Sequence, residues 1–112
     1  MKPLDASKLL SDEYSVKILA ATYREAKSAQ EMSARFDIPI AACYRRIKEL
    51  ETAGFLKCTA RILNQKGKRV KLYRSQVRGA YFFYDNGKLR ARLELSRPDK
   101  PEIDETWDAQ EG

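Results

Sequence analysis

Histidine is absent from this chain of 112 residues, and cysteine occurs only twice. Zinc sites in proteins usually draw on three or four Cys, His or carboxylate ligands. Cys43 and Cys58 are fifteen residues apart, a spacing that fits neither a disulfide framework nor a metal motif. Both fall on predicted apolar faces and are expected to be small buried side chains. The sequence therefore predicts no metal site and no cofactor.

Signatures of catalysis are also missing. The chain has no glycine-rich phosphate loop, no HExxH or DxD pattern and no nucleophile beside a base. The carboxylates of residues 1–95 are scattered at helix starts and turns, where capping and solubility account for them. We therefore predict that the protein is not an enzyme.

Long apolar runs are lacking as well. No segment approaches the ~18 apolar residues that a transmembrane helix needs. The N-terminal segment MKPLDASKLLSDEYS has no apolar centre of the kind found in signal peptides. Together with the few cysteines, this predicts a cytoplasmic protein without membrane association.

What the chain does have is an uneven distribution of charge. Lys and Arg number 22 and Asp and Glu number 16, so the net charge is +6. Residues 96–112 carry a net charge of −4, which leaves +10 on residues 1–95. A folded body this basic favours a polyanionic partner, above all nucleic acid.

Helical periodicity predicts three helices. The first spans residues 12–26, with at most a turn of helix before it at residues 6–10, and the second spans 28–37. Pro39 can open the third helix, which ends before Gly54. Two helices joined by a short turn, with a helix ahead of them, are the layout of a helix-turn-helix.

Two β-hairpins are predicted after the helices. Residues 55–63 and 69–77 alternate around a glycine-containing turn, with one apolar face expected at Leu56, Cys58, Ala60 and Ile62. Asn86-Gly87 is the stronger turn signal, because this dipeptide favours a two-residue hairpin turn. Such a turn pairs Tyr84 with Leu89, Phe82 with Ala91, Ala80 with Leu93, Phe83 with Arg90 and Tyr81 with Arg92.

The segment DIPIAACYRRIKELETAGFL resembles the recognition-helix segment of archaeal winged helix-turn-helix regulators of the ArsR-like group. The matching features are Ile38 before the helix, the YRRIKELE run and the AGFL that leads into the first wing strand. The resemblance covers roughly residues 12–75. One departure concerns the helix start, where the family usually has Ser or Thr and this chain has Pro39, Ala41 and Ala42.

The predicted fold class is α+β: a winged helix-turn-helix of three helices and a β-hairpin wing, with an additional C-terminal β-hairpin and a disordered acidic tail. Residues 1–76 are predicted to be the DNA-binding domain, and residues 77–95 the appended hairpin, packed on the same domain. Residues 96–112 lack periodicity, contain two prolines and are acidic, which predicts the disordered tail.

The resemblance implies that the third helix reads DNA, and Cys43, Ile47 and Leu50 are expected to pack it against the other helices. The predicted DNA-binding residues are Ile40, Ala41, Tyr44, Arg45, Arg46 and Lys48 on this helix, with Lys66, Lys68 and Arg69 at the wing tip. An α-helix fits the major groove, and Arg45 can bind guanine or a phosphate. A solvated basic helix face and a solubilising turn are the alternatives.

These features predict a sequence-specific transcriptional regulator that binds double-stranded DNA as a homodimer. Two other classes stay open. One is a winged-helix protein-interaction module in a transcription or nucleic-acid complex, with the acidic tail as docking site for a protein partner. The other is an RNA or single-strand binder that uses Tyr81, Phe83, Arg90 and Arg92.

Overall fold

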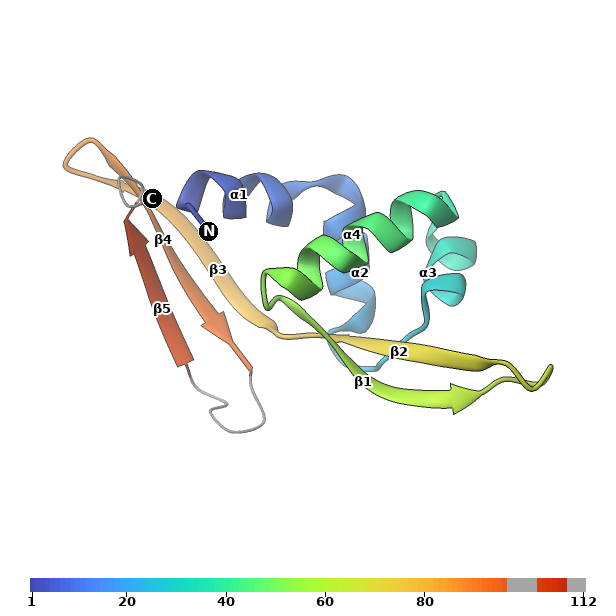
Figure 1. Cartoon of the computed structure of the whole chain (residues 1–112). Helices are drawn as coiled ribbons and strands as arrows, with labels where there is room; N and C mark the ends of the chain where they lie inside the picture. Colours follow the sequence, from blue (N-terminus) through green and yellow to red (C-terminus); the bar gives the residue numbers. More distant parts are fainter. Residues whose placement is uncertain (97–102, 109–112) are drawn as a thin grey trace.

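The computed structural model of the chain describes residues 1–96 and 103–108. Its helices are α1 (Pro3–Ser11), α2 (Glu13–Thr22), α3 (Ala29–Phe36) and α4 (Ile40–Thr52). Its strands are β1 (Leu56–Leu63), β2 (Arg69–Ser75), β3 (Val77–Asp85), β4 (Lys88–Leu95) and β5 (Ile103–Asp108). The antiparallel β1–β2 hairpin, which we call the wing, reaches away from the helices, and a second sheet in the order β3–β4–β5 lies beside α1 (Figure 1).

The core lies where the four helices meet the inner ends of the two sheets. Cys43, Ile47 and Leu50 of α4 are at most 2% exposed, which confirms the predicted buried face of this helix. Ile18 of α2 and Met32 of α3 pack into the same cluster and are fully buried. In the part of the chain that the structure describes, no helix has the length and hydropathy needed to cross a membrane.

The N-terminal helices differ from the predicted pattern. α1 is a full helix of nine residues, and α2 ends at Thr22, well before the predicted end at residue 26. After Thr22 the chain bends, and Lys27 then pairs with Tyr73 of β2 through backbone hydrogen bonds of 3.0 and 2.8 Å. This pairing across the fold competes with helix continuation and leaves no local sequence signal.

Side-chain caps fix the starts of α2 and α3. The carboxylate of Asp12 accepts a hydrogen bond from the backbone N–H of Ser15, and the hydroxyl of Ser28 accepts one from that of Glu31, both at 3.1 Å. Pro39 is the N-cap of α4, with φ and ψ angles of −53° and 133°, so the helix begins at Ile40, one residue later than predicted. The turn between α3 and α4 is short and consists of residues 37–39.

The wing contains a bulge that strict alternation does not predict. Cys58 pairs with Tyr73, whereas Ala60 pairs with the adjacent Leu72, so Thr59 is an extra residue. Side chains of β1 change face at the bulge relative to β2. The predicted continuous apolar face of this strand is therefore wrong beyond Cys58.

The second hairpin has the predicted register, with Tyr84 opposite Leu89, Phe82 opposite Ala91, Ala80 opposite Leu93, Phe83 opposite Arg90 and Tyr81 opposite Arg92. Asn86 and Gly87 have φ angles of 52° and 78°, as a type I′ turn requires. Leu93 and Leu95 are buried on the face toward α1. Tyr84, expected on that apolar face, is 79% exposed because it belongs to the last pairs before the turn.

β5 corrects the expectation of a wholly disordered tail. Residues 103–108 run antiparallel to β4, with Ile103 opposite Leu95 and Asp108 opposite Arg90. A hairpin alone would leave one edge of β4 unpaired, and β5 satisfies the backbone groups there. Composition does not reveal such a pairing, since it depends on where the chain returns. The remaining tail residues, 97–102 and 109–112, lie outside the described residues.

A single residue, Gln76, joins the two sheets. Its N–H donates to the carbonyl of Phe55 at 2.9 Å, and its carbonyl accepts from the N–H of Ser96 at 2.7 Å. No loop separates β2 from β3, so the chain passes directly from the wing into the second sheet (Figure 1).

Candidate nucleic-acid interface

The outward side of α4 presents most of the side chains that the sequence predicted there. Ile40, Ala41, Tyr44, Arg45 and Lys48 are all exposed, and we call them the α4 face. They are exposed because the opposite side of the helix supplies the core. The α4 face thus offers two cations and one phenol to solvent, with the small Ala41 near its N-terminal end.

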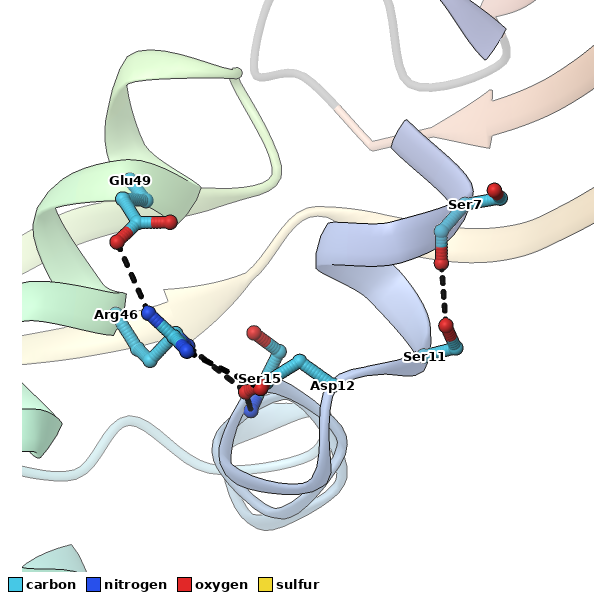
Figure 2. Close-up of polar contacts among 6 residues, drawn as sticks. All are labelled: Ser7, Ser11, Asp12, Ser15, Arg46 and Glu49. Atoms are coloured by element: carbon cyan, nitrogen blue, oxygen red, sulfur yellow. Dashed lines mark hydrogen bonds and ion pairs between the residues drawn. The ribbon is translucent and has the colours of Figure 1, made fainter. Parts of the chain in front are cut away.

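Arg46 does not belong to this face. Its Nε and Nη2 donate to the two carboxylate oxygens of Asp12 at 2.8 and 3.2 Å, and its Nη1 donates to Glu49 at 3.0 Å. Figure 2 shows the guanidinium held between these two carboxylates. Arg46 therefore fastens α4 to the start of α2. The sequence predicts Arg46 as a DNA-binding residue, whereas in the structure its guanidinium is engaged by Asp12 and Glu49.

The Arg46–Asp12 pair is ionised in both members at neutral pH. The hydrogen bond from Arg46 lowers the pKa of Asp12, against the opposing effect of burial, and the N–H of Ser15 lowers it further. The same hydrogen bond raises the pKa of Arg46. Asp12 thus serves both as the cap of α2 and as the anchor for α4.

A hollow of about 330 Å³ joins the α4 face to the wing. Its lining consists of Ala29, Gln30, Tyr44, Arg69, Val70, Lys71 and Tyr73. Gln30 Nε2 donates to the hydroxyl of Tyr44 at 2.5 Å and so links α3 to α4 at its rim. Arg69, Lys71 and Tyr73 are two residues apart along β2, so their side chains lie on the same side of the strand. We call this concave surface the α4–wing hollow; its ionised lining residues are both basic.

Gln30 and Lys71 are functional candidates that the sequence reasoning missed. Gln30 lies in the first turn of α3, and its side chain crosses to α4. The alternation of β2 contained the signal for Lys71, since Arg69, Lys71 and Tyr73 are two residues apart. The location of α3 against β2 was the missing information.

The wing tip presents its three predicted cations in a shaped turn. Lys66, Lys68 and Arg69 are exposed. The side-chain oxygen of Asn64 accepts hydrogen bonds from the N–H groups of Lys66 and Lys68, each at 2.9 Å. Gly67 has a φ of 77°, a conformation that favours glycine. The backbone of the tip is therefore ordered before any partner binds.

The second hairpin offers a weaker case for nucleic-acid stacking. Tyr81 and Phe83 are 53% and 41% exposed on the face away from the core. Phe83 lies opposite Arg90 in register, but Nη1 of Arg90 donates to Asp85 at 3.0 Å. This guanidinium is therefore engaged by a carboxylate within the hairpin.

The cysteines occupy different environments. Cys43 is fully buried, and burial raises the pKa of its thiol. Cys58 is half-buried at the base of the wing. Among residues 1–96 and 103–108, no three His, Cys, Asp or Glu side chains come together in a way that would hold a metal ion.

Comparison with known proteins finds a family match for part of the chain. Residues 10–59 match the family model of a helix-turn-helix domain, a range that contains α2, α3 and α4 and the start of β1. No curated protein matches the chain. In helix-turn-helix domains the second helix of the motif contacts base edges, and α4 occupies that position. The matched domain favours DNA as the partner of this chain.

Proposed function

We propose that the protein is a sequence-specific transcriptional regulator that binds double-stranded DNA, with α4 in the major groove and the wing on the flanking backbone. The α4–wing hollow is the observation that carries this proposal. It brings Tyr44 of the helix and Arg69 and Lys71 of the wing onto one concave, basic surface. The major groove is about 12 Å wide and admits one α-helix with its side chains.

The roles within this interface follow from side-chain chemistry. Arg45 can donate two parallel hydrogen bonds to guanine, and Lys48 can neutralise a phosphate. Ala41 is small enough to let the start of the helix approach base edges or thymine methyl groups. Because no hydroxyl side chain lies at the helix start, Tyr44 and Arg45 carry most of the polar recognition.

We also propose an ArsR-like homodimer, on the basis of the resemblance of the α4 segment. A two-fold dimer of helix-turn-helix units reads two half-sites one helical turn apart. The exposed aromatic face of the second hairpin, with Tyr81 and Phe83, supports a contact between copies, since aromatic side chains are enriched at interfaces. Sedimentation equilibrium of the full chain and of a Tyr81→Ser/Phe83→Ser variant tests this part.

Substitution of Arg45 tests the proposed function. Arg45→Ala should weaken binding to a selected duplex site by about 1–3 kcal/mol, with a smaller loss on random duplex. Lys88→Ala is the matched control, because it removes one positive charge at the tip of the second hairpin. Fluorescence anisotropy at fixed salt measures both. Equal affinities of Arg45→Ala and the unmodified chain, with unchanged melting temperature, would contradict the proposal.

A further inference from the structure

The β3–β4–β5 sheet has two edges of different composition. β4 lies in the middle, so β3 and β5 each have one side without a strand partner among the described residues. From Gly79 to Tyr84 the β3 sequence is GAYFFY, which contains no charged residue and no proline. β5 has the sequence IDETWD, with three acidic residues. Since charges and prolines normally protect edge strands from pairing, this part of β3 lacks two common protections.

The backbone groups of β3 alternate in direction along this edge. Asp85 and Lys88 flank the two-residue turn and therefore form a hydrogen-bonded pair. Hydrogen-bonded and non-hydrogen-bonded pairs alternate along an antiparallel ladder. Ala80, Phe82 and Tyr84 belong to the non-hydrogen-bonded pairs with β4, so their N–H and C=O groups point away from that strand. These three residues offer backbone donors and acceptors to a further strand.

The regular part of this edge is symmetric about Phe82. A bulge before Gly79 and the turn after Asp85 bound a segment of seven residues, and Phe82 is its middle residue. A second copy of this segment can pair antiparallel with it about a two-fold axis at Phe82. Phe82 then lies opposite Phe82 of the second copy, and Ala80 lies opposite Tyr84. All these residues have outward backbone groups, as hydrogen-bonded pairs require.

The same register brings exposed aromatic side chains together. Tyr81 and Phe83 are both exposed on the face away from the core. In the two-fold arrangement, Tyr81 lies opposite Phe83 of the second copy in a non-hydrogen-bonded pair, in which cross-strand side chains are closest. Aromatic pairs at such positions stabilise sheets. The rings of the two copies would therefore cover one another on one face of the joined sheet.

The β3 edge is also the more accessible and more compatible edge for a second copy. In the part of the chain that the structure describes, β3 packs mainly on β4, and the outer end of the hairpin extends beyond α1 (Figure 1). Self-pairing of β5 would bring the acidic residues of two copies together, and like charges across a strand pair are destabilising. Of the two edges, β3 is therefore the one that suits pairing with itself.

We propose that two copies of this chain join edge to edge through β3, with the two-fold axis at Phe82. The two three-stranded sheets then form one continuous sheet of six strands. The contact is isologous and closes after two copies, because each β3 edge is used once. This inference rests on the proposed homodimer and specifies the backbone contact that builds it. Packing of the aromatic faces alone would leave the outward N–H groups of β3 in water.

A proline at residue 84 separates backbone pairing from side-chain contact. The N–H of Tyr84 points away from β4, so Tyr84→Pro keeps the β3–β4 ladder and removes one outward donor from each copy. Tyr84→Val is the matched control, because it also removes the phenol ring but keeps the N–H. Because two hydrogen bonds are lost per dimer, sedimentation equilibrium should give Tyr84→Pro a dimer dissociation constant at least about tenfold above that of Tyr84→Val. Equal constants would overturn the proposal.

Hydrogen exchange of the unmodified chain locates the pairing even if the proline variant fails to fold. The amides of Ala80, Phe82 and Tyr84 should exchange at least about tenfold more slowly in the dimer than at concentrations where the chain is monomeric. The amides of Tyr81 and Phe83 bond to β4 in both states, so their exchange should change far less. Equal slowing of both sets would indicate general stabilisation of the hairpin and would contradict the edge contact.

The outcomes also separate this inference from the proposed function. A dimer whose outward β3 amides exchange as fast as those of the monomer would use another surface, which would refute the edge contact and leave the homodimer. A chain that stays monomeric at every concentration would refute a second copy as the occupant of the edge, and with it the homodimer. DNA binding is tested apart from both, because Arg45→Ala on a single half-site reports on α4 whether or not the chain dimerises.

Discussion

The two hairpins of this protein have similar lengths but opposite relations to the core. The strands of the wing have eight and seven residues, and those of the β3–β4 hairpin have nine and eight. The wing is buried only at its base, at Leu56, Tyr73 and Ser75. The second hairpin buries Ala91, Leu93 and Leu95 of β4, and this strand contacts α1. One hairpin extends into solvent, and the other helps to build the core.

The difference shows what alternation predicts and what it leaves open. Both hairpins alternate in sequence, and both form the expected antiparallel pairs. Alternation predicts pairing, but burial depends on whether another layer covers one face. α1 covers the second hairpin, whereas the Thr59 bulge and a run of basic residues leave the outer wing exposed. The same alternating pattern thus gives an exposed hairpin in one case and a hairpin with one buried face in the other.

The largest expected effect is on stability. Leu93→Ala removes a fully buried side chain of the second sheet and should lower the free energy of unfolding by about 2–5 kcal/mol. Ile62→Ala in the wing, where the side chain is 46% exposed, should lower it by less than about 1 kcal/mol. Urea denaturation followed by circular dichroism measures both. Similar losses of unfolding free energy in the two variants would contradict the conclusion that only the second hairpin helps to build the core.

The next effect is on DNA binding and concerns the wing alone. Replacing Lys66, Lys68 and Arg69 with Ala should lower the salt-dependence slope by roughly 0.9 for each lost phosphate contact. If three contacts are lost, raising the salt from about 50 to 200 mM should weaken DNA binding by the variant about 40-fold less than DNA binding by the unmodified chain. The change should be alike for selected and random duplexes, because phosphates carry no base information. Anisotropy titrations across salt concentrations measure the slope.

Loss of affinity for one sequence only would show that the wing tip reads bases. A Lys88→Ala/Arg90→Ala variant provides a control at the tip of the second hairpin. Its salt slope should stay that of the unmodified chain, since that tip lies at the other end of the molecule from the wing tip (Figure 1).

Two adjacent arginines of α4 differ in a similar way, because Arg46 holds α4 to the start of α2 whereas Arg45 is exposed to solvent. Arg46→Ala should destabilise the fold by about 1–2 kcal/mol at pH 7, because it removes charge-assisted hydrogen bonds to Asp12. Arg45→Ala should leave the free energy of unfolding within about 0.5 kcal/mol of the original. Urea denaturation at pH 7 compares the two variants.

The Arg46 effect should also depend on pH. Folding lowers the pKa of Asp12 below 3.8, so the contribution of the pair is present above that pH and is lost as pH falls through the lowered value. The stability difference between Arg46→Ala and the original should therefore shrink on acidification below about pH 4. A difference in unfolding free energy that stays constant down to pH 2 would mean that the pairing with Asp12 does not account for the effect of Arg46→Ala.

The smallest effect concerns the two turns. Gly67 and Gly87 have φ angles of 77° and 78°, and an added Cβ meets no atom at either position. Alanine at either site costs about 1 kcal/mol of backbone strain. Gly87→Ala should lower the global melting temperature, whereas Gly67→Ala should raise amide exchange only at the wing tip. A lower melting temperature for Gly67→Ala would show that the wing melts together with the core.

Features set by local sequence were predictable. The cap of α3, the buried side of α4 and the Asn86-Gly87 register all depend on residues close together in the chain. The α4 face and the wing tip are exposed as predicted, and whether these residues bind DNA stays a prediction. Arg46 differs from the other predicted residues of α4 because it pairs with Asp12, which is 34 residues away and leaves no local signal of the pairing.

The remaining differences arise from packing across the fold. α2 ends early because Lys27 joins the edge of β2, and β5 forms because β4 offers an unpaired edge. The Thr59 bulge turns the β1 side chains without any glycine or proline to mark it. Each depends on which segments meet in space, and a single sequence without a template does not contain that information in readable form.

The direct passage from β2 to β3 through Gln76 limits how the chain can change in length during evolution. An insertion at this position would displace the ladder bonds of both sheets and turn the following strand residues to the opposite face. An insertion between Asn64 and Lys68 would lengthen only an exposed tip. Relatives of this protein should therefore vary in length at the wing tip and keep a constant spacing between Tyr73 and Ala80.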